Sequence, residues 1–220
     1  MRIRFLLLPG LLLLLSACRG AAFRDYHFTE PVEYYFYLPE EAGPGPAPLF
    51  IALLGEGHSP LDCIDLFQIF AKDRGYALLC PDLGGEGGLA DPLQAERDLA
   101  AILTELYSTN TFQNRFSLTG FGDGGAFALD YALKYPQAVS GVTAMSVDTY
   151  PQNFVAPGPL PVQLLVGKED EEAVVAAQAV GQAWLAQGML VRVVPVEGNG
   201  QSPSQAFARF SSELVDQVSE

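Results

Sequence analysis

The segment of this sequence best suited to chemistry is Arg115–Gly125, which reads RFSLTGFGDGG. An apolar run leads into Gly120, small residues follow, and a helical pattern of apolar residues starts at Ala126. A strand that meets a helix through glycines is typical of the G-x-S-x-G turn, which lifts a serine hydroxyl above a sheet to attack an acyl carbon. The serine position is occupied here by Gly122, which has no side-chain nucleophile. The sequence therefore predicts an acyl-transfer turn without its attacking atom.

Segments with the patterns of strands and helices alternate from about residue 30 onwards. Short apolar or β-branched runs predict strands at 32–38, 48–54, 76–80, 115–119, 141–145, 161–166 and 191–196. Helical spacing, caps and stops predict helices over 60–74, from 92, from 126 to 135, over 171–187 and from 203. This alternation favours an α/β fold, a mostly parallel sheet with helices on both faces. We expect a single domain over 31–220, with no internal repeat.

The helix that starts at Asp91-Pro92 has the clearest pattern. Gln94 stands three residues after Asp91, which predicts a capping box at the helix start. Its apolar residues recur at helical spacing and predict one buried face, formed by Leu99, Ile102, Leu103 and Leu106.

The first residues have the pattern of an export signal. Arg2 and Arg4 precede the apolar run Phe5–Leu15, and Leu15-Ser16-Ala17-Cys18 follows. This predicts a signal peptide over 1–17. Its end resembles the lipobox of bacterial lipoproteins, which implies cleavage before Cys18 and acylation of that cysteine. The alternative is an ordinary cleavage site with an incidental cysteine. With the lipobox, the chain is expected outside the cytoplasm, anchored by lipid to a bacterial membrane, with residues 18–30 as a tether.

The charge of the chain limits its partners. The formal net charge is −14, and removal of residues 1–17 would take away two arginines and leave −16 on 203 residues. So acidic a surface repels nucleic acid and anionic lipid headgroups. We therefore expect no nucleic-acid partner, and attachment to the membrane through the lipid anchor alone.

Two cysteines remain after Cys18. Cys63 and Cys80 would face an oxidising compartment, where a disulfide between them would add about 3 kcal/mol of stability. Two buried, unpaired thiols are the alternative. The sequence leaves both open.

From about residue 30 to 218, the chain resembles the α/β-hydrolase family, in particular small lidless bacterial esterases and the polyhydroxybutyrate-depolymerase-like group. Four segments in the correct order carry the resemblance: ALLGEG at 52–57, the block 97–133, GKED at 167–170 and EGNGQS at 197–202. The resemblance implies a catalytic triad at the carboxyl ends of the strands.

Three triad positions of that family can be matched to this chain, and two have lost their chemistry. The serine position is Gly122, the acid position is Asp170, and the position of the base histidine is Gln201. The His-Gly pair that the family places near the oxyanion hole reads Leu54-Gly55 here. A glutamine amide cannot accept a proton near neutral pH. Asp170 itself also stands where a helix N-cap is wanted, so cap and former acid are both open readings.

Other polar residues are expected near the same mouth. Glu56, His58 and Asp123 are the pocket candidates, and Ser146 and Asp148 could line the same opening. A relocated Ser–His pair that used His58 is the alternative in which activity survives. The acidic residues at this mouth favour a cationic or polyhydroxylated ligand.

A second motif reads through the same turn. Gly120-x-Gly122-x-x-Gly125 matches the dinucleotide fingerprint, and Asp148 follows the next strand at about the expected distance. The motif falls in mid-chain and inside the hydrolase register, so nucleotide binding is the third interpretation. We expect no cofactor and no metal.

The sequence thus predicts a non-catalytic α/β-hydrolase-like lipoprotein that binds a small polar ligand or a protein partner, or acts as a scaffold, at the cell envelope. An esterase with a relocated nucleophile is the alternative, and a dinucleotide-binding protein is the third.

Overall fold

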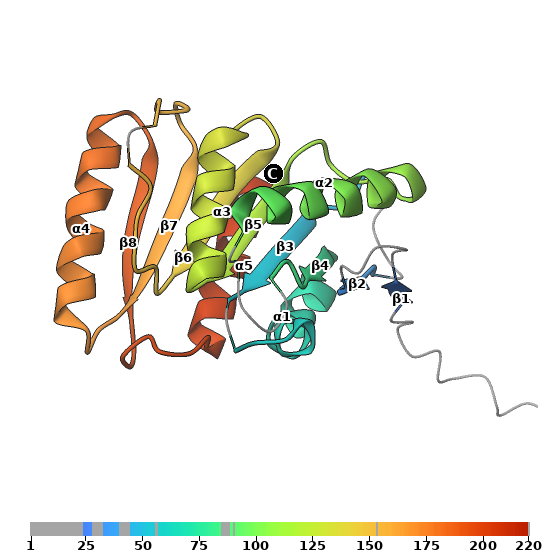
Figure 1. The fold of residues 1–220 in the computed structure, drawn as a ribbon, viewed down its shortest axis with the longest axis horizontal. Helices are drawn as coiled ribbons and strands as arrows, with labels where there is room; N and C mark the ends of the chain where they lie inside the picture. The colour runs from blue at the N-terminus through green and yellow to red at the C-terminus, as the bar shows by residue number, and fades with distance from the viewer. Residues whose placement is uncertain are drawn as a thin grey trace, which may run out of the picture.

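The structure is a computed structural model that describes residues 24–27, 33–39, 45–55, 57–84, 89, 91–152 and 154–219. Within these ranges, eight strands form one sheet in the order β1-β2-β4-β3-β5-β6-β7-β8 (Figure 1). The strands are β1 (Arg24–His27), β2 (Glu33–Tyr37), β3 (Leu49–Leu54), β4 (Ala77–Pro81), β5 (Phe116–Phe121), β6 (Val139–Met145), β7 (Pro161–Gly167) and β8 (Leu190–Val196). The helices are α1 (Pro60–Arg74), α2 (Pro92–Thr109), α3 (Asp123–Lys134), α4 (Glu171–Ala186) and α5 (Gln205–Val218).

The sheet is mostly parallel, as predicted. β4, β3, β5, β6, β7 and β8 pair in parallel, whereas β2 pairs antiparallel with both β1 and β4. All seven predicted strands and all five predicted helices are present, with ends that differ by a few residues.

Helices cover both faces of the sheet, and each face has its own core. In β3, Leu49, Ile51 and Leu53 point into the core that contains α2, α3 and α4, and the residues between them point into the core of α1 and α5. Figure 1 shows α2 and α3 in front of the sheet and α4 beside β8 at its edge. Two-sided burial explains why the central strands read as continuous apolar runs.

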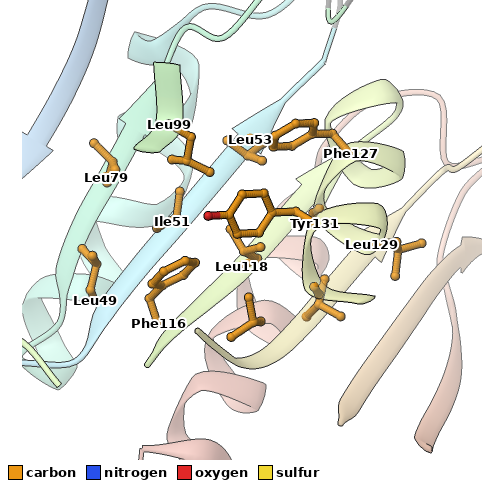
Figure 2. Packing of buried hydrophobic residues seen from close by; sticks show 14 of the residues in the cluster. Leu49, Ile51, Leu53, Leu79, Leu99, Phe116, Leu118, Phe127, Leu129 and Tyr131 are labelled. Atoms are coloured by element: carbon orange, nitrogen blue, oxygen red, sulfur yellow. The ribbon is translucent and has the colours of Figure 1, made fainter. Parts of the chain in front are cut away.

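The larger core confirms the apolar face predicted for α2. Leu99, Ile102, Leu103 and Leu106 are all buried. Figure 2 shows Leu99 of this face near the β3 and β5 side chains, with Phe127 and Tyr131 of α3 closing the other side.

Two predictions need correction. The predicted tether over 18–30 contains β1, whose residues pair with β2 by backbone hydrogen bonds, so the sheet starts before residue 31. The short sequence RDYH has no apolar alternation to announce a strand. The capping box predicted for α2 is also wrong. Asp91 accepts from the N–H groups of Leu93 and Gln94, but the Gln94 amide donates to Asp98 instead of returning to the cap.

Several predictions concern residues that the structure does not describe. The signal peptide, Cys18 and the remaining parts of the tether other than β1 lie outside the described residues, as does Glu56. No helix in the described part of the chain has the length and apolar character needed to cross a membrane.

The two cysteines whose pairing the sequence leaves open form a disulfide. Cys63 on α1 and Cys80 on β4 are bonded, with their Cα atoms 6.0 Å apart, and both are buried. The bond joins the helix to the strand that it packs against.

The chain changes direction across the sheet between β3 and β5. From β3 it passes through α1 to β4 on one side, and from β4 it returns through α2 to β5 on the other side of β3. In open α/β sheets, ligands bind at the carboxyl ends of the strands at such a reversal point. The loop after β3 and the turn after β5 meet there.

Candidate functional site

The turn between β5 and α3 keeps an unusual backbone at Gly122. This residue has φ 59° and ψ −127°, and its N–H donates to the Met145 carbonyl at 2.9 Å. A Cβ built on Gly122 would meet nothing within 4 Å. This positive-φ backbone, which would strain any residue with a side chain, and the free space beside it are those expected of a turn that presents a side chain. No side chain is present to use them.

The glycines beside Gly122 have a packing role. A Cβ on Gly120 would overlap the backbone of Gly124, and a Cβ on Gly124 would overlap the Leu53 carbonyl oxygen. The start of α3 is therefore in close contact with both β5 and β3. This approach needs glycines whatever the chemistry of the turn.

Asp170 follows β7 and acts as a helix cap. Its Oδ1 accepts from the Ala173 N–H at 2.9 Å, which caps α4, and its own N–H donates to the Gly167 carbonyl. This is the only hydrogen bond of its carboxylate within the described residues. The cap interpretation is confirmed, and it explains the residue without catalysis.

Gln201 follows β8 in a turn that packs against the end of β7. A Cβ on Gly167 would overlap the backbone of Asn199, and the Glu169 N–H donates to the Gly198 carbonyl at 3.2 Å. The Gln201 N–H donates to Asn199 Oδ1, and its side chain is exposed. The two turns thus adjoin, but no hydrogen bond joins the side chains of Asp170 and Gln201 within the described residues.

The Asp123 carboxylate lies where the two loops of the reversal point meet. Its Oδ2 accepts from the Leu89 N–H at 2.7 Å, and its Oδ1 accepts from the Gly124 N–H at 3.0 Å. A Cβ on Gly55 would overlap Asp123 Oδ1, so the carboxylate packs directly on that glycine. The sequence predicts Asp123 at the mouth, but it does not predict the contacts of its carboxylate with Gly55 and Leu89. These contacts join the turn after β5 to loops that are distant in sequence.

His58 lies in the loop after β3, as predicted. Its backbone N–H donates to the Gly55 carbonyl, and its ring meets the Phe121 ring edge-on at 5.5 Å. With Gly55 and Leu89 it lines a cavity of about 10 Å³, which is the size of one water molecule.

The Ser146 and Ser59 hydroxyls donate to acceptors other than an imidazole. Ser146, which has φ 55°, donates to the Gly200 carbonyl, and Ser59 donates to the Asp62 carboxylate at 2.8 Å. Asp148 is exposed. These contacts do not favour a relocated Ser–His pair over a site without catalysis.

Comparison with known proteins identifies the architecture. The chain matches no protein-family profile and no curated protein sequence. It superposes on a thermostable esterase (TM-score 0.66, 15% identity), covering 90% of this chain and 62% of that one. A predicted CIB-like hydrolase of Thermoplasma acidophilum (TM-score 0.65, 17% identity) matches 90% of this chain and 98% of its own length. Esterase 2 of Thermogutta terrifontis (TM-score 0.67, 15% identity) matches 90% of this chain and 93% of its own length. The chain has the α/β-hydrolase fold.

In the α/β-hydrolase fold, the oxyanion hole is formed by the N–H of the residue after the nucleophile and an N–H of the loop after the third strand of the core. Here these are Asp123 and the loop at Gly55. The Asp123 carboxylate therefore places negative charge beside the groups that would stabilise a negative oxygen.

The same contacts bear on nucleotide binding. In the dinucleotide fingerprint, the helix N-terminus receives a pyrophosphate. The Asp123 carboxylate already accepts from the Gly124 N–H at the start of α3, and the glycines of the motif are explained by close packing. A pyrophosphate would meet a like charge at this place. Among the described residues, no group of three or more His, Cys, Asp or Glu side chains could hold a metal ion.

Proposed function

We propose that this protein is a non-catalytic α/β-hydrolase-fold lipoprotein that binds a ligand or a partner at the cell envelope. The observation that carries the proposal is Gly122, which has the positive-φ backbone of the nucleophile position and open space beside it but no attacking atom. In a serine protease, loss of the serine alone costs about 10⁶ in kcat.

The acid and base positions support the same proposal. Gln201 cannot serve as a general base, and the Asp170 carboxylate is engaged in capping α4. The charge of Asp123 beside the Gly55 loop would raise the energy of an oxyanion. Binding interactions alone would leave about 10³–10⁴-fold acceleration over water, which is too little for a working hydrolase.

A serine-directed fluorophosphonate probe tests the absence of a nucleophile. We expect the mature protein to remain unlabelled under conditions that label an active serine esterase. Labelling would refute the proposal, and mapping the labelled serine would then identify a relocated nucleophile. Ser146→Ala and Ser59→Ala variants would show whether either hydroxyl is responsible.

The envelope location is supported by the lipobox-like residues before Cys18 and by the buried disulfide Cys63–Cys80, since disulfides persist in oxidising compartments. Metabolic labelling with palmitate in a bacterial host tests it. The full chain should incorporate label and fractionate with membranes, and Cys18→Ala should abolish the label. Unlabelled, freely released wild-type protein would contradict the anchor and leave the binding role to be tested separately.

A further inference from the structure

A groove between α2, α3 and residues 151–152 and 154–155 lies apart from the reversal point. Its volume is about 480 Å³, within the range of small-molecule sites, and it shares no lining residue with the small cavity at His58. Phe127, Phe154 and Pro151 contribute apolar surface. The Phe154 ring packs edge-on against Trp184, with ring centroids 5.4 Å apart, which holds this wall of the groove in place.

The charges in this groove do not balance. Lys134 Nζ lies 2.8 and 2.7 Å from the two oxygens of Glu96, and the Tyr135 hydroxyl donates to the same carboxylate. Lys134 is therefore committed to Glu96. The Asp130 carboxylate has no ion pair or hydrogen bond within the described part of the chain. The groove therefore has one uncompensated negative charge.

The Asp130 carboxylate is exposed at the groove but partly desolvated. Desolvation raises the pKa of Asp130, and the nearby charge of Glu96 raises it further. A bound cation would relieve both effects.

A hydroxyl without a partner in the described part of the protein lies on the same wall. Tyr131 is only 8% exposed, lines the groove, and makes no hydrogen bond through its hydroxyl within the described residues. Burial, then Tyr135 and Glu96, raise the pKa of Tyr131, so the hydroxyl remains protonated and available as an acceptor. Because the hydroxyl has no partner among the described residues and lies at the groove, its oxygen can accept a hydrogen bond from a ligand.

We propose that this groove binds an organic ammonium ion, with the Asp130 carboxylate as its counter-charge, the Tyr131 hydroxyl as an acceptor for its N–H, and Phe127 and Phe154 against its apolar part. A carboxylate beside aromatic rings is a suitable environment for such a cation. A neutral polyol would leave the negative charge uncompensated.

Binding of benzylamine, benzyl alcohol and benzyltrimethylammonium to the folded protein, followed by NMR titration, tests the proposal. Benzylamine should bind at millimolar concentration and benzyl alcohol much more weakly. Asp130→Asn should weaken benzylamine by about tenfold, the loss of one charge-assisted hydrogen bond. Asp65→Asn, an exposed carboxylate on α1, is the matched control and should have no effect.

Tyr131→Phe separates the hydroxyl from the charge. It should weaken benzylamine but leave benzyltrimethylammonium unchanged, because the quaternary ion has no N–H to donate. Equal binding of alcohol and amine, equal affinity of the Asp130→Asn variant, or no binding of benzylamine would each overturn the proposal. The outcome of the fluorophosphonate labelling, which tests for a nucleophile, does not depend on any of these results.

Discussion

At the scale of single residues, Gly122 and Gly124 are glycines for different reasons. Gly122 has a positive φ and free space around its Cα, so a side chain there would cost only backbone strain. Gly124 has no such space, because its Cβ would overlap the Leu53 carbonyl of the neighbouring strand. The first glycine stands where a side chain would find room, whereas the second is needed for packing.

A pair of alanine variants should separate these roles. Gly122→Ala should lower the free energy of unfolding by about 1 kcal/mol, from the positive φ. Gly124→Ala should lower it by about 3 kcal/mol or more, because β3 and α3 must move apart. Urea denaturation of both variants measures the difference. Equal losses would contradict the close approach of α3 to β3.

Asp123 should decide whether a restored nucleophile can work. Gly122→Ser with Gln201→His supplies the missing oxygen and imidazole, and we expect this double variant to hydrolyse a short-chain aryl ester measurably. Adding Asp123→Asn should raise kcat by about tenfold, because it removes negative charge beside the developing oxyanion. Asp148→Asn, also near the mouth, is the control. An inert but folded double variant would contradict the proposed match of these positions to the triad.

At the scale of elements, short polar contacts fix the helix ends around the site. Ser59 and Asp62 form a reciprocal capping box at α1, and Asp170 caps α4. The two caps orient the loops after β3 and β7 relative to the sheet. Both caps are local arrangements. The Asp170 cap also occupies the position at which a triad would need its acid.

Asp170→Ala should lower the stability by about 1 kcal/mol, the usual value for a lost N-cap. Asp170→Asn should retain it, since asparagine caps as well as aspartate. In the double variant with serine and histidine, however, Asp170→Asn should reduce ester hydrolysis if the carboxylate can also orient the imidazole. Thermal unfolding measures the role of Asp170 as an N-cap, and the ester assay measures its role as the acid of a triad. Loss of stability in the asparagine variant would contradict the cap.

The Ser59–Asp62 box should make α1 sensitive to acid. Hydrogen bonds from the Ser59 backbone N–H, and then from its hydroxyl, lower the pKa of Asp62, with a smaller effect of His58. Because the folded-state pKa lies below the unfolded one, this stabilisation is complete above the unfolded value and is lost as the pH falls through the folded value. Wild type should therefore lose a few tenths of a kcal/mol relative to Asp62→Asn below about pH 4. Measured free energies of unfolding that depend on pH in the same way for wild type and Asp62→Asn would contradict this role of the box.

At the scale of the whole molecule, the disulfide links α1 to β4 within the smaller core. Cys63 and Cys80 are both buried among apolar residues, so the bond is protected from reductants while the protein is folded. It is a structural bond in the part of the sheet next to the reversal point.

Replacing both cysteines by alanine should lower the free energy of unfolding by about 3 kcal/mol, mainly through the entropy of the unfolded chain. Urea denaturation of the variant, and of wild type with and without a reductant, measures this. The variant should be insensitive to the reductant. Equal free energies of unfolding for the variant and for wild type without reductant would contradict a structural role.

Most of the fold could be predicted because it depends on local patterns. The buried face of α2 and the strand–helix alternation follow from apolar spacing within single segments. β1 could not be predicted, because Arg24–His27 forms a strand only by pairing with β2. The Asp123 carboxylate was expected at the mouth, but its contact with Gly55 depends on how β3 and β5 pair, which no single segment encodes.

The sequence by itself determined that residue 122 has no nucleophile and residue 201 no imidazole, since side-chain chemistry does not depend on folding. It also determined the acidity of the chain and the order of its elements. Only the tertiary structure decided that Cys63 meets Cys80, that Asp170 caps α4 and that Asp123 lies on Gly55. The Asp170 cap is a local contact that the sequence left open beside the role of an acid. The Cys63–Cys80 and Asp123–Gly55 contacts join groups separated along the chain, which the packing of helices on the sheet brings together.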